Sequence, residues 1–211
     1  IISCEGEMIY LDRQMILFSK QIIESNPDAQ IVFDVKCTKL LSDAISSFGG
    51  EPVICKTGHT FIKQKIRETN AQLGGEMSGH IFFNDRWPGF DDGIYAGARM
   101  LEIIANSKKK NVFSDIPNLT STPEINIPYA DSKKFQIVER FIHESSFENA
   151  RIIDIDGIRV EFEKGWGLLR ASNTSPVLVL RFEAETESHL DEIKRIFYKN
   201  LNRIDSSIDE F

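Results

Sequence analysis

Short apolar runs alternate with helical patterns through the first half of the chain. The runs have the length of buried strands, and the residues between them place apolar side chains on one face of a helix. Alternating elements of this kind build layered α/β domains, because the helices cover the faces of the sheet. The strand-like runs are residues 31–33, 52–55 and 81–83, and the helical patterns carry Leu11, Met15, Phe18 and Ile22, then Leu41, Ala44, Ile45 and Phe48, then residues 59–69, and finally Ile94, Ala98, Leu101 and Ala105. We predict an α/β domain with a mixed sheet.

The second half of the chain has a pattern typical of antiparallel strands. Residues 152–162 alternate around Asp156-Gly157, a dipeptide that favours a two-residue hairpin turn. Two more strand-like runs flank the polar residues 170–176, and a final helical pattern runs from Leu190 to Ile204. We predict a smaller α+β domain with an antiparallel sheet and a C-terminal helix.

A polar, non-periodic stretch at residues 107–123 suggests where one domain ends and the next begins. The chain starts without Met in a strand-like run that turns at Glu5-Gly6. We expect this start to be the strand remnant of a preceding domain, although a processed or short natural protein is the alternative. The predicted division is residues 1–10 for the remnant, 11–118 for the α/β domain and 119–211 for the α+β domain.

Composition argues against nucleic acid and membrane partners. The formal net charge is -7, from 25 Lys+Arg and 32 Asp+Glu, which repels polyanions and anionic lipids. No apolar run approaches the roughly 20 residues that span a bilayer. The cysteines Cys4, Cys37 and Cys55 lack Cys-x-x-Cys spacing, so we predict reduced thiols in a cytoplasmic protein.

One candidate binding segment is the polar loop at residues 170–175, between two predicted strands. Arg170 offers a guanidinium fork, and Ser172, Asn173 and Thr174 offer hydroxyl, amide and backbone N–H groups. Such groups suit a phosphate. The alternative is an ordinary polar turn whose side chains bond their own backbone.

A second candidate is the glycine-rich segment at residues 74–80. It surrounds Glu76, Ser78 and His80 with glycines that allow a ligand to approach the backbone closely. Sugar hydroxyls donate readily to a carboxylate, and histidine exchanges protons near neutral pH. Taken alone, the segment is more typical of a turn.

Two strand ends carry further candidates. Lys36 lies just beyond the predicted strand at residues 31–35, and Thr57-Gly58-His59 follows the next run and opens a predicted helix. Strand ends in α/β sheets form binding crevices, and helix N-termini favour anions. A solvated lysine and a threonine helix cap are the alternatives. Asp91-Asp92 has no third ligand nearby, so we expect a helix cap there and no metal.

Together these segments resemble the α-D-phosphohexomutase family. The segments that carry the similarity are GEMSGH at residues 75–80, TGH at 57–59, DVKCT at 34–38, KGWGLLRASNTSPVLVLRFEAET at 164–186, FDDGIY at 90–95 and STPEI at 121–125. The similarity covers essentially the whole chain. Met77 fits the branch that acts on both mannose and glucose phosphates, whereas phosphoglucosamine mutases more often have Gln there.

The resemblance implies that the chain corresponds to the third and fourth of four domains. In that family a phosphoserine of the first domain transfers its phosphoryl group through a hexose 1,6-bisphosphate, with Mg²⁺ held by the second domain. The chain alone is then expected to be inactive, to hold no metal, and to need the missing amino-terminal domains and a phosphorylated hexose as partners. A phosphoglucosamine mutase fragment or a free-standing sugar-phosphate-binding module stays open as an alternative.

The resemblance also implies a role for each candidate residue. Glu76 and Ser78 hold sugar hydroxyls; Lys36 and His59, with Gly58 between the strand and the helix, orient the sugar phosphate; His80 lies near the transferring phosphoryl group; and Arg170, Ser172, Asn173 and Thr174 bind the non-reacting phosphate, with Arg181 a weaker candidate.

Overall fold

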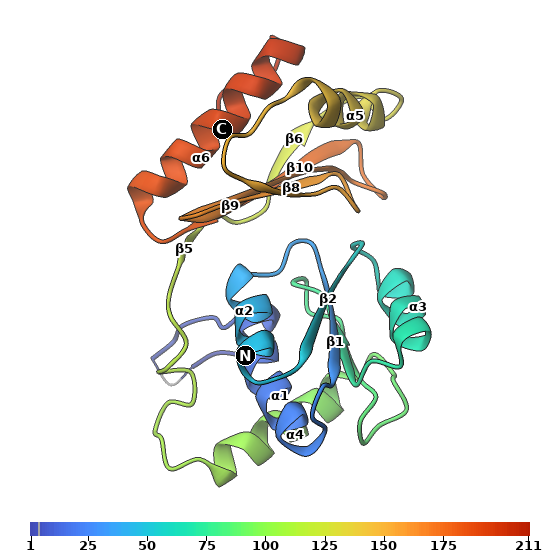
Figure 1. Ribbon diagram of the computed structural model, residues 1–211, viewed down its shortest axis with the longest axis vertical. Coiled ribbons are helices and arrows are strands. Elements are labelled where there is room, and N and C mark those ends of the chain that lie inside the picture. Colours follow the sequence, from blue (N-terminus) through green and yellow to red (C-terminus); the bar gives the residue numbers. More distant parts are fainter. Residues whose placement is uncertain (4) are drawn as a thin grey trace. The chain divides into compact units, whose positions relative to one another are not determined.

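The computed structural model describes residues 1–3 and 5–211, so the predicted thiol of Cys4 lies outside the described residues. The chain forms two compact units, residues 1–117 and 118–211 (Figure 1). Among the described residues, no helix is long and apolar enough to cross a membrane.

The first unit is a four-stranded mixed sheet in the order β2-β1-β3-β4. Strand β1 pairs in parallel with both β2 and β3, and β4 pairs antiparallel with β3. The elements are α1 (Leu11–Ser25), β1 (Gln30–Asp34), α2 (Lys39–Ser47), β2 (Glu51–Cys55), α3 (His59–Thr69), β3 (Leu73–Gly75), β4 (Ile81–Phe83) and α4 (Gly93–Asn106). The predicted α/β mixed-sheet domain is confirmed.

Helices cover both faces of this sheet because its central strand is apolar on both sides (Figure 1). Ile31 and Phe33 pack with residues of α1, α2 and Met100 of α4, whereas Val32 packs with Ile62 and Ile66 of α3. Thus α3 lies alone on one face and the other three helices share the opposite face. Burial of these apolar side chains stabilises the unit.

The topology brings three loops to one edge of the first unit. Because β1, β2 and β3 run parallel, the residues that follow them leave the sheet at the same edge. These loops are residues 35–38, 56–58 and 76–80.

The second unit is an antiparallel sheet in the order β5-β10-β9-β8-β7, with β6 also paired to β10. Its strands are β5 (Thr120–Ser121), β6 (Ile125–Pro128), β7 (Arg151–Ile153), β8 (Ile158–Phe162), β9 (Gly165–Ala171) and β10 (Val177–Ala184), and its helices are α5 (Lys134–Glu144) and α6 (Glu187–Ile204). Both helices pack on one face, where Phe141, Phe182 and Phe197 form an aromatic cluster (Figure 1). The predicted α+β domain is confirmed.

Two details differ from the sequence expectations. Four residues, 154–157, connect β7 to β8, so the turn is longer than the two residues that Asp156-Gly157 suggested. Gly157 does supply a left-handed backbone, with φ of 72°. The apolar face expected on the last helix of the first unit is solvent-exposed, since Ile94 is 89% and Leu101 67% exposed.

Candidate functional site

A fully buried carboxylate organises the loop edge of the first unit. Asp34 ends β1, and its Oδ1 accepts hydrogen bonds from the backbone N–H of Met77 at 3.1 Å and from Cys37 Sγ at 3.2 Å. Its Oδ2 accepts from Thr57 Oγ1 at 3.0 Å and lies 3.9 Å from Lys36 Nζ. One side chain therefore ties all three loops together. Sequence reasoning did not single out Asp34, although a charge at the end of an apolar strand was the available signal.

Glu76 is buried near Asp34. It is 3% exposed, and its Oε1 has no hydrogen-bond partner in the described part of the chain. Burial raises the pKa of Glu76, and the nearby Asp34 charge raises it further, whereas His80, Lys36 and the backbone N–H of Gly58 act in the opposite direction. The structure thus holds a desolvated carboxyl with an unused acceptor oxygen.

His80 is oriented by Asp91. Its Nδ1 lies 2.5 Å from Asp91 Oδ2, while Asp91 Oδ1 accepts from the backbone N–H of Ile81 at 3.2 Å. Because an ionised carboxylate only accepts, Nδ1 carries the proton and Nε2 is the ring atom left for another partner. The expectation of a cap at Asp91-Asp92 is correct for Asp92 alone, whose Oδ1 accepts from the first N–H groups of α4.

The remaining candidates of this unit lie around Glu76 and His80. Gly58 caps α3 with φ of 135°, a conformation that L side chains rarely adopt. His59 is the first residue of α3, and its ring centroid lies 5.8 Å from that of His80. Lys36 is buried, and Ser78 is exposed in the tight turn between β3 and β4. The structure therefore brings the first-unit candidates to one edge of the sheet.

The second unit presents the predicted phosphate loop at one end of its central hairpin. Ser172 Oγ accepts from the backbone N–H groups of Thr174 at 3.3 Å and Ser175 at 3.1 Å, which curls the chain into a compact turn. Asn173 and Thr174 are exposed at its tip. Arg170, at the end of β9, donates from Nε to Asp156 Oδ2 at 3.0 Å, and this bond fixes the plane of the guanidinium.

A lysine that sequence reasoning missed joins this loop. Lys134 at the start of α5 is 3% exposed, and its Nζ donates to the Ser175 carbonyl at 2.9 Å and pairs with Asp131 at 2.6 Å. It adds a cation beside the loop. Lys134 and Ser175 are 41 positions apart, which left no local signal for this pairing.

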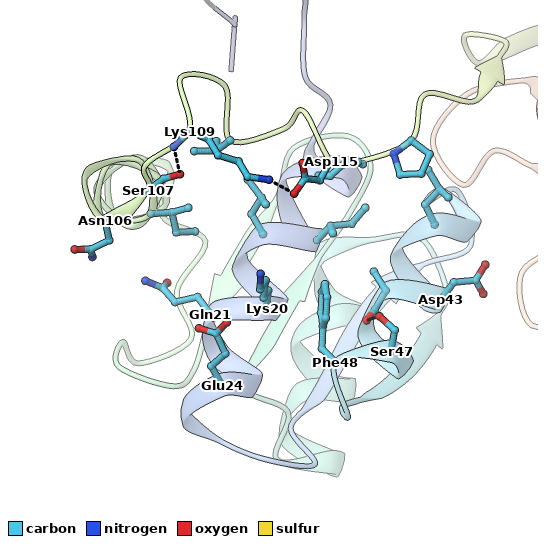
Figure 2. Close-up of a pocket in the computed structure, with 18 residues that line it drawn as sticks. Lys20, Gln21, Glu24, Asp43, Ser47, Phe48, Asn106, Ser107, Lys109 and Asp115 are labelled. Atoms are coloured by element: carbon cyan, nitrogen blue, oxygen red, sulfur yellow. Dashed lines mark hydrogen bonds and ion pairs between the residues drawn. The ribbon is translucent and has the colours of Figure 1, made fainter.

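An apolar cavity of about 750 Å³ lies elsewhere in the first unit, between α1, α2, the end of α4 and residues 107–117 (Figure 2). Its walls include Leu40, Phe48 and Val112 together with Lys20 and Glu24, and it holds none of the candidate residues. Among the described residues, no three His, Cys, Asp or Glu side chains gather as metal ligands.

Comparison with known proteins covers both units. The family model described as phosphoglucomutase/phosphomannomutase, alpha/beta/alpha domain III, matches residues 11–118, and the one described as phosphoglucomutase/phosphomannomutase, C-terminal domain, matches residues 124–199. The chain belongs to the phosphoglucomutase/phosphomannomutase family. The resemblance predicted from the loop motifs is therefore confirmed.

The chain spans about half the length of the curated relatives that it matches. It is 51% identical over 210 residues to a phosphomannomutase/phosphoglucomutase of Pseudomonas aeruginosa, a match that covers 99% of the chain and 45% of that enzyme. A phosphoglucomutase of Neisseria gonorrhoeae is 48% identical over 200 residues, covering 93% of the chain and 44% of the relative. A solved phosphoglucomutase/phosphomannomutase family protein from Burkholderia thailandensis superposes with a TM-score of 0.93 at 43% identity, over 100% of the chain and 45% of that structure.

The raised pKa of Glu76 predicts how the stability of this phosphohexomutase chain depends on pH. At a pH below 4.5, the ordinary pKa of glutamate, the Glu76 carboxyl is protonated in both the folded and the unfolded chain. Above it the unfolded state loses the proton first and binds fewer protons than the folded state, so stability falls until the pH passes the raised pKa. Glu76→Gln removes this titration. We expect the variant to gain stability relative to the parent as the pH rises above 4.5, until it passes the raised pKa of Glu76.

Urea unfolding at a series of pH values measures this difference. Glu24→Gln, at an exposed glutamate of the same unit, is the matched control. A stability difference for Glu76→Gln that does not change with pH would show that the buried carboxyl does not titrate as inferred.

Proposed function

We propose that the chain is the sugar- and phosphate-binding half of a phosphomannomutase/phosphoglucomutase. The complete enzyme interconverts hexose 1-phosphate and hexose 6-phosphate of mannose and glucose. A phosphoserine in the amino-terminal half gives its phosphoryl group to the free hydroxyl of the hexose phosphate. The resulting hexose 1,6-bisphosphate returns its other phosphoryl group to the serine, so that no phosphate is gained or lost.

The observation that carries this proposal is the Glu76 carboxyl. It is buried, it has an acceptor oxygen without a hydrogen-bond partner in the described chain, and burial costs the charged form free energy. Two neighbouring hydroxyls of a hexose would supply the missing donors. In this role Glu76 and Ser78 hold the sugar ring, and the energetic cost of keeping an unpaired carboxyl is offset when the sugar binds.

The groups around Glu76 suit the phosphorylated end of the sugar. Lys36 supplies a cation, and the N-terminus of α3 at Gly58 and His59 attracts anions. His80, fixed through Nδ1 by Asp91, keeps Nε2 as a group that can exchange a proton with the reacting hydroxyl.

The loop of the second unit suits the phosphate that does not react. Arg170 contributes a charge-assisted donor, and Ser172, Asn173 and Thr174 contribute the hydroxyl, amide and backbone groups of the turn. Binding a remote phosphate positions the reacting end of the substrate and so contributes to turnover. Lys134 holds the loop in place through its hydrogen bond to the Ser175 carbonyl.

We assign magnesium and the phosphoserine to the amino-terminal half, as the resemblance to the family implies. An N-acetylphosphoglucosamine mutase from Aspergillus fumigatus with the same fold, 14% identical, was solved with GlcNAc-6P and magnesium. When bound, the metal supplies charge neutralisation during transfer. We place the protein in the cytoplasm, where cysteines such as the buried Cys37 and Cys55 stay reduced.

The proposal predicts that this chain alone has no mutase turnover and that turnover returns when the amino-terminal half is supplied. A fused protein that joins the amino-terminal segment of the Pseudomonas aeruginosa enzyme to Ile1 supplies it. A coupled assay of glucose 1-phosphate conversion measures both the chain alone and the fused protein. Turnover by the isolated chain, or a fused protein that folds but does not turn over, would overturn the proposal.

A further inference from the structure

The cavity between α1, α2, the end of α4 and residues 107–117 is built by the first unit alone (Figure 2). Its volume of about 750 Å³ lies within the range of about 300–1,000 Å³ that is usual for small-molecule sites. Protein interiors are close-packed and leave few voids larger than a water molecule. A hollow of this volume, separate from every residue proposed to bind the hexose phosphate, is therefore a second candidate binding site.

Residues 107–117 form one wall of the cavity and are fixed to the rest of the unit. Phe113 is 7% exposed and packs in the core, and its backbone N–H donates to Asn111 Oδ1 at 2.9 Å. The carbonyl of Ile116 accepts from Arg13 Nη2 of α1 at 3.5 Å. The polar stretch that marked a domain boundary in the sequence is thus a structured wall, so the cavity is formed before any ligand binds.

Apolar side chains from three segments line the cavity. Leu17 comes from α1, Leu40 from α2, and Phe48 follows α2 directly. Val112 and Ile116 face them from the opposite wall. All five are partly buried and pack against the core on one side, so each keeps apolar surface toward the cavity. An apolar ligand body would remove this surface from water, which favours binding.

Lys20 of α1 points into the cavity beside the Phe48 ring (Figure 2). On the opposite wall Lys109 pairs with Asp115. The hydrogen bond from Lys109 lowers the pKa of Asp115, and the charge of Lys20 lowers it further, so the Lys20 ammonium lies toward that wall. Throughout the described chain, Lys20 Nζ makes no hydrogen bond and no ion pair. An ammonium with three donors is therefore available to a ligand at the centre of the cavity.

Two further acids line the cavity and leave this ammonium available. Asp43 pairs with Lys39 at 2.7 Å, and its carboxylate points away from the cavity (Figure 2). Glu24 lies one turn after Lys20 on α1 and is exposed to solvent. Its carboxylate is not within ion-pair distance of Lys20 in the part of the chain that the structure describes. The cavity thus combines apolar walls with a cation that its own acids do not neutralise by contact.

We propose that this cavity binds a small amphipathic organic acid. Its apolar body lies between Leu40, Phe48 and Val112, and its carboxylate or sulfonate accepts hydrogen bonds from the Lys20 ammonium. A hydrogen bond between two ionised groups is stronger than one between neutral groups, so the acid is preferred over a neutral molecule of the same shape. The site is separate from the sugar loop and the phosphate loop, and the proposal does not depend on the proposed function.

Fluorescence titration with anilinonaphthalene sulfonate tests the site without relying on turnover. This probe joins a sulfonate to aromatic rings and becomes fluorescent when it leaves water. Octanoate and octanol then compete for the site, since their chains are of equal length and only octanoate carries a charge. We expect octanoate to displace the probe from the fused protein at a concentration about 10-fold lower than octanol does.

Four variants of the fused protein locate the binding. Lys20→Gln removes the charge, and we expect octanoate to become no better a competitor than octanol. Lys110→Gln is the control, because Lys110 is an exposed lysine of the same segment that does not line the cavity. Ala44→Phe places a ring inside the cavity and is expected to abolish probe binding, with thermal unfolding confirming that the unit is folded. Glu24→Gln removes a nearby negative charge and should tighten octanoate binding.

Three results would overturn the proposal. The first is octanoate that competes equally well in Lys20→Gln and in the parent. The second is probe binding that Ala44→Phe leaves unchanged, since the probe would then bind elsewhere. The third is a probe that binds the 211-residue chain but not the fused protein, because the amino-terminal half would then cover the cavity.

Discussion

Replacing Arg170 by alanine in the fused enzyme is expected to lower kcat/KM by about 10- to 100-fold, the usual effect of one charge-assisted phosphate contact. The guanidinium is held by Asp156 at 3.0 Å and is therefore preorganised for a phosphate. KM should rise and kcat should fall, because the remote phosphate positions the reacting end of the substrate. Arg170→Lys should recover only part of the loss, since lysine keeps the charge but lacks the planar fork.

The control for this substitution is Arg151→Ala, on an edge strand of the same sheet, where the side chain is 71% exposed. Thermal unfolding of each variant establishes that the second unit remains folded at the assay temperature. A kcat/KM for Arg170→Ala equal to that of the parent would show that this loop does not bind the substrate phosphate.

Replacing Asp34 by alanine is expected to destabilise the first unit by about 3–5 kcal/mol. The carboxylate accepts from Thr57, Cys37 and the backbone N–H of Met77, and all three contacts are lost together. The buried Lys36 ammonium also loses a nearby opposite charge. Asp34→Asn keeps the shape but replaces one acceptor with a donor, so we expect an intermediate loss.

The measurement is denaturant unfolding, monitored by the fluorescence of Trp87 in the first unit. The chain has 2 tryptophans, so Trp166→Phe leaves Trp87 as the only indole reporter. Asp43→Ala is the control, because its ion pair with Lys39 is exposed and is expected to contribute less than about 0.5 kcal/mol. If the unfolding transition of Asp34→Ala, monitored at Trp87, equals that of the parent, Asp34 does not hold the three loops together.

The sequence alone was sufficient to predict the helices and strands whose signals lie in neighbouring residues. The apolar residues 31–33 lie in the central strand β1. The spacing of Met15, Phe18 and Ile22 correctly predicted the buried face of α1. The same reasoning located α4 but not the environment of its apolar face. Periodicity shows that a face is apolar, and it does not show whether the covering surface belongs to the same chain.

The candidate site was predictable only in part, for a similar reason. Motif similarity indicated Glu76, His80 and Arg170, whereas the groups that hold them in place depend on contacts between distant segments. Asp34 contacts Thr57 and Met77, which lie 23 and 43 positions further along the chain. Asp91 orients His80, which lies 11 positions earlier. Such partners are fixed by the parallel strand order and the β3–β4 turn, and no spacing rule on the sequence selects them.

The proposed function assigns sugar binding to Glu76 in the first unit and phosphate binding to Arg170 in the second unit. Calorimetric titration of the fused protein tests it directly, with glucose 1-phosphate and inorganic phosphate as ligands and with Glu76→Gln and Arg170→Ala as variants. We predict that each variant weakens binding of glucose 1-phosphate, while only Arg170→Ala weakens binding of inorganic phosphate. If Glu76→Gln binds glucose 1-phosphate as tightly as the parent, the sugar-binding role of the buried carboxyl is wrong.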